Sequence, residues 1–252
     1  MRAVNGDSAG QSTKRRIEEA ALHLFAAKGF EATGIRDIAD RVGISTAALY
    51  HYMGSKDELL VDFMLVSMTQ LTRAAREALA TADEPASELA ALVRTHVGFH
   101  TLDPLRSLVA DDELRSLSEE ALARVMVLRD SYEALWADLL ERGLADGVFH
   151  ICDARIARLA LLEMCNGIVR WYSDAGPMGP AEVADAFTDL ALAMVGTRCQ
   201  GRALKLGDLR CAPTSEVLQI VERVLREVDD VAVRPPAVGA AAVRPAASAG
   251  VA

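Results

Sequence analysis

The sequence has few cysteines and no long apolar run, and each absence excludes a class of protein. No apolar run reaches the ~18 residues of a membrane-spanning helix, and residues 1–11 lack the apolar stretch of a secretory signal. The four cysteines, at positions 152, 165, 199 and 211, show no C-x-x-C spacing, which argues against a disulfide framework or a zinc site. We therefore expect a cytoplasmic protein with reduced thiols and no membrane partner.

The sequence also lacks a recognisable set of catalytic side chains. No Ser/His/Asp or Cys/His combination has a usable spacing, and the adjacent acids Asp111 and Asp112 are typical of a solvated face. His96 and His100 stand four residues apart, a spacing that can hold a metal, but no third ligand is evident. We interpret them as a pocket wall or polar core, with a metal site as the alternative. The sequence predicts no catalytic residues, no metal and no cofactor.

Charge is distributed unevenly along the chain. The net charge of −9 argues at first against a nucleic-acid partner. Up to Lys56, however, the chain has eight Lys or Arg and six Asp or Glu, a net charge of +2. The remainder has 19 Lys or Arg and 30 Asp or Glu, a net charge of −11. A mildly basic N-terminal part on an acidic body permits DNA binding by that part.

Every element predicted from the sequence is a helix, so the expected fold class is all-α. Ala/Leu-rich stretches with a polar face, separated mostly by Gly or Pro, predict helices near residues 85–101, 118–144, 153–171 and 180–197. A further apolar periodicity over 214–228 predicts one more helix. No stretch has a convincing β alternation, and there is no internal repeat.

Polar caps divide the first 60 residues into shorter helices. Apolar residues recur at helical spacing up to residue 25. Thr33 is expected to cap a short helix that ends before Gly43, and Ser45 a second one that ends near residue 53. Ser55, with Glu58 three residues later, forms a capping box that opens a long helix. Two short helices separated by a Gly-Ile-Ser break have the length pattern of a helix-turn-helix.

At this point the sequence resembles the TetR (tetracycline-repressor-like) family of one-component regulators. The resemblance covers about 45 consecutive residues without a gap. It implies an N-terminal DNA-binding domain and a helical body that binds an effector and dimerises. The matching residues are Ile17, Ala20, Ala21, Phe25, Gly29, Phe30, Thr33, Ile38, Ala39, Val42, Gly43, Ile44, Ser45, Leu49, Tyr50, Tyr52, Ser55, Lys56, Leu59 and Leu60.

Eight residues of this segment are candidates for DNA contact. The resemblance implies that the positions of Thr33, Tyr50 and Lys56 contact the DNA backbone, and helix openings attract phosphate on physical grounds too. The second short helix offers small side chains that allow a close approach to base edges. The alternative is that Thr33, Ser45 and Ser55 only cap helices and that Tyr50 is an edge of the core. The candidates are Thr33, Arg36, Ser45, Thr46, Ala47, Tyr50, His51 and Lys56.

The body resembles, more loosely, a branch of the family whose known effectors include acyl-CoA thioesters. Residues 94–100, 128–149 and 170–177 carry this resemblance. We expect a mainly apolar effector cavity, with Arg129 or Arg170 available for an anionic group. Core packing is the alternative for the aromatic and Met stripes. The expected lining residues are Phe99, Met126, Arg129, Tyr132, Trp136, Met164, Arg170 and Trp171.

The resemblance implies a homodimer whose last two core helices form a four-helix bundle across a two-fold axis. Residues 156–168 and 183–194 are more apolar than one buried face requires. Such a dimer binds a palindromic operator on double-stranded DNA. The predicted function is a DNA-binding repressor released by a small hydrophobic or acyl-CoA-like effector. The alternative is a helical interaction module or an enzyme that retained the helix-turn-helix as a scaffold.

These features predict five segments. Residues 1–11 form a disordered N-terminus, 12–55 the DNA-binding domain, and 56–199 the effector-binding and dimerisation domain. Residues 200–230 form an extension with one helix, which exceeds the usual C-terminal end of the family. Residues 231–252, rich in Ala, Val, Pro and Gly without period, form a disordered tail.

Overall fold

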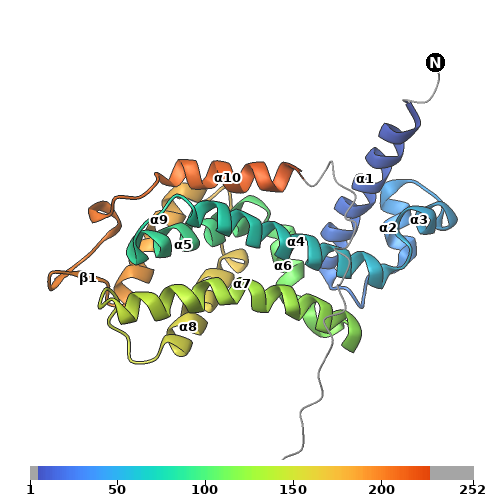
Figure 1. Cartoon of the computed structure of the whole chain (residues 1–252). Coiled ribbons are helices and arrows are strands. Elements are labelled where there is room, and N and C mark those ends of the chain that lie inside the picture. Colours follow the sequence, from blue (N-terminus) through green and yellow to red (C-terminus); the bar gives the residue numbers. More distant parts are fainter. Residues whose placement is uncertain (1–4, 228–252) are drawn as a thin grey trace, which may run out of the picture.

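A computed structural model describes residues 5–227 of the chain, and these residues are almost entirely helical (Figure 1). The all-α prediction is confirmed. In chain order the elements are α1 (Asn5–Lys28), α2 (Ile35–Val42), α3 (Thr46–Met53), α4 (Lys56–Leu79), α5 (Pro85–Leu102), α6 (Pro104–Asp112), η1 (Leu114–Ser116), α7 (Glu119–Ala145), α8 (Ala154–Asn166), η2 (Gly167–Arg170), α9 (Pro180–Met194), β1 (Arg198–Cys199), β2 (Arg202–Ala203), η3 (Leu206–Asp208) and α10 (Thr214–Glu227).

Helices α1–α3 form a head at one end of the molecule, and α4 runs from this head into the body (Figure 1). The head has an apolar core of its own, which includes Phe25, Ile38 and Leu49. That core also takes in Val109 of α6 and Val125 of α7. The expected boundary at residue 55 therefore separates two groups of helices but does not separate two cores.

The short helices of the head begin and end close to where the sequence predicts. The Ser45 hydroxyl accepts a hydrogen bond from the Ala48 amide at 3.2 Å, and the Ser55 hydroxyl accepts one from the Glu58 amide at 3.0 Å. The Ser55 amide donates in return to the Glu58 carboxylate at 2.8 Å, which completes the predicted capping box. The prediction for Thr33 is wrong, because the N-cap of α2 is the next residue, Gly34.

The ends of the chain differ from the predicted segments. Helix α1 begins at Asn5, inside the range expected to be disordered. Packing of the segment near Ile17 nucleates the helix, and adding further turns toward the N-terminus then costs little free energy. A sequence without strong helix signals can therefore still extend the helix. The predicted tail at residues 231–252 lies outside the described residues. Residues 198–203 form a two-stranded ladder, too short to show the alternation expected of a strand.

The C-terminal extension packs back along the body. Helix α10 lies beside α4 and α5 (Figure 1), and its side chains Val217, Leu218, Val221 and Val224 are buried. Gly98 of α5 makes this close packing possible, because a Cβ atom there would stand 2.4 Å from Leu218 Cδ2. On the outer side, Arg223 pairs with Glu77 and Arg73 pairs with Glu227. The extension is therefore an integral layer of the body.

Candidate functional site

Helix α3 presents a continuous exposed face. Ala47, Tyr50 and His51 are exposed, at the i, i+3 and i+4 positions of one side of the helix, and Tyr50 is 53% exposed. Leu49 and Met53 point into the head core. Ser45 and Thr46 open α3, with Ser45 exposed and Thr46 half-buried, and Arg36 is exposed on α2.

Two of the expected DNA-contacting residues are engaged within the head. Thr33 is 1% exposed, and its hydroxyl donates to the Gly29 carbonyl at 2.8 Å, so the structure does not present it at the surface. The Lys56 ammonium donates to the carbonyls of Phe30 and Thr33 at 2.9 and 3.1 Å and lies 4.0 Å above the Phe30 ring centroid. Lys56 remains partly exposed and has a third N–H, which leaves it able to contact a phosphate.

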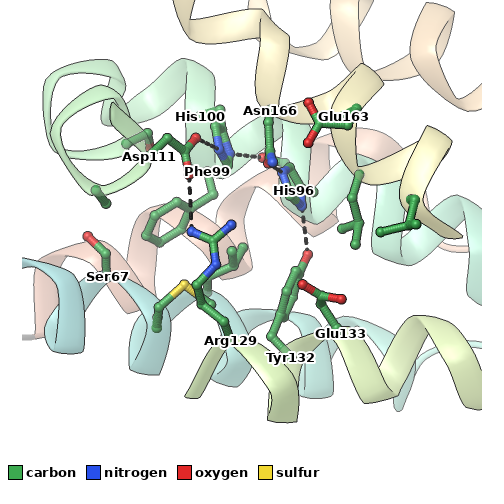
Figure 2. Close-up of a pocket in the computed structure, with 16 residues that line it drawn as sticks. Ser67, His96, Phe99, His100, Asp111, Arg129, Tyr132, Glu133, Glu163 and Asn166 are labelled. Carbon is green, nitrogen blue, oxygen red and sulfur yellow. Dashed lines mark hydrogen bonds and ion pairs between the residues drawn. The ribbon is translucent and has the colours of Figure 1, made fainter. Parts of the chain in front are cut away.

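Five helices of the body surround a cavity with about 660 Å³ of empty space, its mouth included (Figure 2). Its exposed lining residues, Leu159 and Glu163, belong to α8, so the mouth lies beside that helix. The lining residues are Ser67, Met68 and Leu71 of α4; His96, Phe99 and His100 of α5; Ser107, Ala110 and Asp111 of α6; Arg129, Tyr132 and Glu133 of α7; and Leu159, Leu162, Glu163 and Asn166 of α8.

Two polar networks cross this cavity (Figure 2). His96 Nδ1 lies 2.9 Å from the Tyr132 hydroxyl, and its Nε2 lies 2.9 Å from Asn166 Oδ1. Burial lowers the pKa of His96 well below its ordinary value, so its imidazole is neutral at pH 7. In the second network, the Asp111 carboxylate lies 3.6 Å from the Arg129 guanidinium and 3.5 Å from His100 Nε2.

Three of the eight residues expected to bind an effector line the cavity, namely Phe99, Arg129 and Tyr132. Trp136 is fully buried and meets His96 edge-on, with ring centroids 6.1 Å apart, so it packs behind the wall. The surface of the cavity is mainly apolar, as expected, although ten of its sixteen lining residues carry polar groups.

The other four expected residues lie elsewhere. Arg170 Nη2 pairs with Asp112 Oδ1 at 2.6 Å on the surface. Trp171 is 57% exposed and stacks on Phe187. Met126 and Met164 are half-buried, and neither is among the cavity-lining residues.

The interpretation of His96 and His100 as a pocket wall is confirmed. Within residues 5–227 no group of three or more His, Cys, Asp or Glu side chains is placed to hold a metal ion. The sequence reasoning missed the polar residues Ser67, Ser107 and Asn166, because single polar residues on apolar helices carry no distinctive signal. It also missed α6, which is only nine residues long.

Known proteins resemble this chain over most of its length. Residues 17–63 match the family model "Bacterial regulatory proteins, tetR family", and residues 82–195 match "Tetracyclin repressor-like, C-terminal domain". The HTH-type transcriptional repressor KstR2 of Rhodococcus jostii (strain RHA1) is 31% identical over 191 residues, which cover 74% of this chain and 93% of that protein.

The chain belongs to the TetR family. Among solved structures, the TetR-family regulator PfmR from Thermus thermophilus is 38% identical with a TM-score of 0.65, over 71% of this chain and 97% of that one. AibR, solved in complex with isovaleryl coenzyme A and operator DNA, shares the fold at 21% identity and a TM-score of 0.65, over 71% of this chain and 97% of AibR.

Membership of the TetR family makes the protein a ligand-responsive, DNA-binding transcriptional regulator, with α2 and α3 as its helix-turn-helix. No helix within residues 5–227 is long and apolar enough to span a membrane. The matched body domain ends at residue 195, so α10 lies beyond the part of the chain that the family model describes.

Proposed function

We propose that the protein is a cytoplasmic, homodimeric repressor that leaves a palindromic operator when a small hydrophobic or acyl-CoA-like effector enters the cavity. The observation that carries the proposal is the shared helix α4. It begins at Lys56 in the head and contributes Ser67, Met68 and Leu71 to the cavity wall. A molecule in the cavity therefore contacts the helix on which the head is mounted.

Dimerisation is supported by apolar side chains left exposed on α8 and α9. Ile156 and Leu190 are 61% and 55% exposed, and Leu159 and Met194 are each 42% exposed. Exposed apolar residues gathered on two neighbouring helices favour an interface. A two-fold dimer through these helices would carry two copies of α3, as a palindromic operator requires.

The effector class is supported by the lining of the cavity and by relatives. Met68, Leu71, Phe99 and Leu162 give the cavity an apolar wall against which an acyl chain could pack. AibR, which shares the fold, was solved with isovaleryl coenzyme A. The effector releases DNA only if it binds the DNA-incompetent arrangement more tightly than the DNA-binding one. Its entry must therefore favour a position of α4 in which the distance between the two copies of α3 no longer matches the operator.

The alternative is an interaction module or an enzyme built on the same scaffold. Two curated relatives, the KstR2 proteins of Rhodococcus jostii and Mycolicibacterium smegmatis, are named as transcriptional repressors, which favours regulation. Footprinting on DNA that flanks the protein's own gene distinguishes the possibilities. A repressor protects a palindrome, and titration with acyl-CoA thioesters, free acids and planar drugs removes the protection. Release by a cationic drug and by none of the thioesters would exclude the acyl-CoA class.

The role of the head is tested by the salt dependence of operator binding. Lys56→Met removes a phosphate contact and should lower the slope of log affinity against log salt by about one unit. Lys205→Met, an exposed lysine of the body, removes the same charge and should leave the slope unchanged. An unchanged slope for Lys56→Met on a genuine operator would show that Lys56 makes no phosphate contact and serves only to bind the Phe30 and Thr33 carbonyls of the head. Substitution of Thr46 or His51 should instead alter sequence preference.

A further inference from the structure

One end of the cavity has hydrogen-bonding capacity that the protein itself does not use. Ser67 and Ser107 are both 3% exposed, yet neither hydroxyl has a hydrogen-bond partner among the described residues. The same holds for Asp111 Oδ2, which is buried and has His100 Nε2 at 3.5 Å as its ion-pair neighbour. All three side chains line the same cavity.

These oxygens belong to α4 and α6, whereas the exposed lining residues Leu159 and Glu163 belong to α8. Ser107 and Asp111 are four residues apart on α6 and thus share one face of that helix. Ser67 of α4 lies on the same side of the cavity as Asp111, while Glu133 and Glu163 lie on the other side (Figure 2). A buried polar group without a partner costs about 1–3 kcal/mol, so three around one space point to a ligand group that satisfies them.

The charges at this end select the kind of group. Asp111 pairs with Arg129 at 3.6 Å, and a carboxylate can only accept hydrogen bonds. A ligand carboxylate would be repelled by Asp111, and a ligand ammonium would be repelled by Arg129. An uncharged hydroxyl avoids both penalties, because it donates to Asp111 and accepts from a serine or from the guanidinium.

We propose that this end of the cavity, defined by Ser67, Ser107, Asp111 and Arg129, binds an uncharged hydroxyl carried on the apolar part of the effector. The proposal rests on the cavity being the effector site of the proposed function. It narrows the effector class to hydroxylated acyl or hydrophobic molecules whose hydroxyl lies at the end remote from any bulky charged group.

The test uses two matched ligand series, and binding is measured by calorimetry without DNA. The first contains octanoyl-CoA, 8-hydroxyoctanoyl-CoA, 8-aminooctanoyl-CoA and octanedioyl-CoA, and the second contains octanol, octylamine and octanoate. Within the series that binds, the hydroxyl member should bind at least about tenfold more tightly than the charged members, the factor that one satisfied buried hydrogen bond provides. In the thioester series it should exceed octanoyl-CoA by a similar factor.

Two variants and a control identify the residues responsible. Ser107→Ala should reduce the preference for the hydroxyl about tenfold, yet leave the Tm of the unliganded protein unchanged or higher, because the hydroxyl it removes has no internal partner. Asp111→Asn should abolish discrimination against the carboxylate. Asp112→Asn, next to Asp111 but paired with Arg170 on the surface and outside the cavity lining, should leave the preference intact.

Equal binding of all members, a preference for the carboxylate or the amine, or no binding by either series would overturn the proposal. A fall in the Tm of Ser107→Ala would also contradict it, because the hydroxyl would then have a partner within the protein. The proposed function is tested independently of this proposal. It fails if the protein protects no operator, or if it stays bound to the operator in the presence of ligands that calorimetry shows to bind.

Discussion

The backbone amide of Phe30 donates a hydrogen bond to the carboxylate of Glu113, 83 residues further along the chain, at 2.9 Å. The carbonyl of Phe30 accepts from Lys56, so both backbone polar groups of this residue of the head are bound by side chains. Glu113 follows directly after α6, and Asp111, two residues earlier, lines the cavity. The end of α6 therefore contacts both the head and the effector site.

Removal of the Glu113 carboxylate should loosen the head. Glu113→Ala leaves the amide of Phe30, a residue that is 3% exposed, without its acceptor, and should cost about 1–3 kcal/mol in the free energy of unfolding. Denaturant unfolding measures the loss, and hydrogen exchange should rise at residue 30. Glu113→Gln keeps an oxygen acceptor and should lose much less. Equal losses in the two variants would show that charge, rather than the hydrogen bond, matters here.

Stability should fall on mild acidification because of His96. Burial depresses the pKa of His96 in the folded protein below its ordinary value of 6.5, so below that pH the unfolded chain binds the extra proton. The free energy of unfolding should therefore decrease as the pH falls from 6.5 toward 5, by at most about 1.4 kcal/mol per pH unit from this group. The Tm of His96→Gln should vary less than that of the wild type over this window. The same slope in both proteins would assign the effect to other groups.

Three of the four cysteines should differ sharply in reactivity. Burial raises the pKa of the Cys165 thiol to about 12, whereas Cys152 and Cys199 are exposed. Iodoacetamide at pH 8 should modify Cys152 and Cys199 and leave Cys165 intact, because only the thiolate reacts. Peptide mass spectrometry identifies which cysteines have been modified. In denaturant all three should react at similar rates, and early modification of Cys165 in the native protein would indicate that the body opens there.

Helix α10 should contribute measurably to the stability of the body. Val221 is fully buried between α10 and the rest of the core, so Val221→Ala should cost about 2 kcal/mol through lost apolar contact and a residual cavity. The neighbouring exposed Glu222 pairs with Arg226 on the same helix, and Glu222→Ala should change stability by less than about 0.5 kcal/mol. Similar small effects at both positions would mean that α10 detaches easily.

Much of the fold could be predicted from the sequence because local signals mark it. Ser45 and Ser55 are N-caps where the cap pattern places them, and the long helices begin within a few residues of the expected positions. Local signals failed at Thr33, where Gly34 takes the cap because the Asp37 carboxylate accepts from the Gly34 amide.

The cavity was harder to predict because it depends on the packing of five helices. The aromatic and Met stripes indicated apolar faces, and the largest of those side chains, Trp136, is buried in the core. The cavity instead forms where small or polar side chains such as Ser67, Ser107 and Asn166 meet. Only the tertiary arrangement reveals which polar residues face each other, and the same holds for Lys56, whose carbonyl partners lie 23 and 26 residues away.

The composition of the head core has a consequence for exchanging modules between regulators. Because Val109 and Val125 of the body complete that core, a chimera that joins residues 1–55 to a foreign body would replace part of its own hydrophobic interior. A functional transplant has to carry matching side chains at the end of α6 and the start of α7, together with an acceptor equivalent to Glu113. In this protein the DNA-binding head can be transferred to another body only together with the α6 and α7 side chains that complete its core.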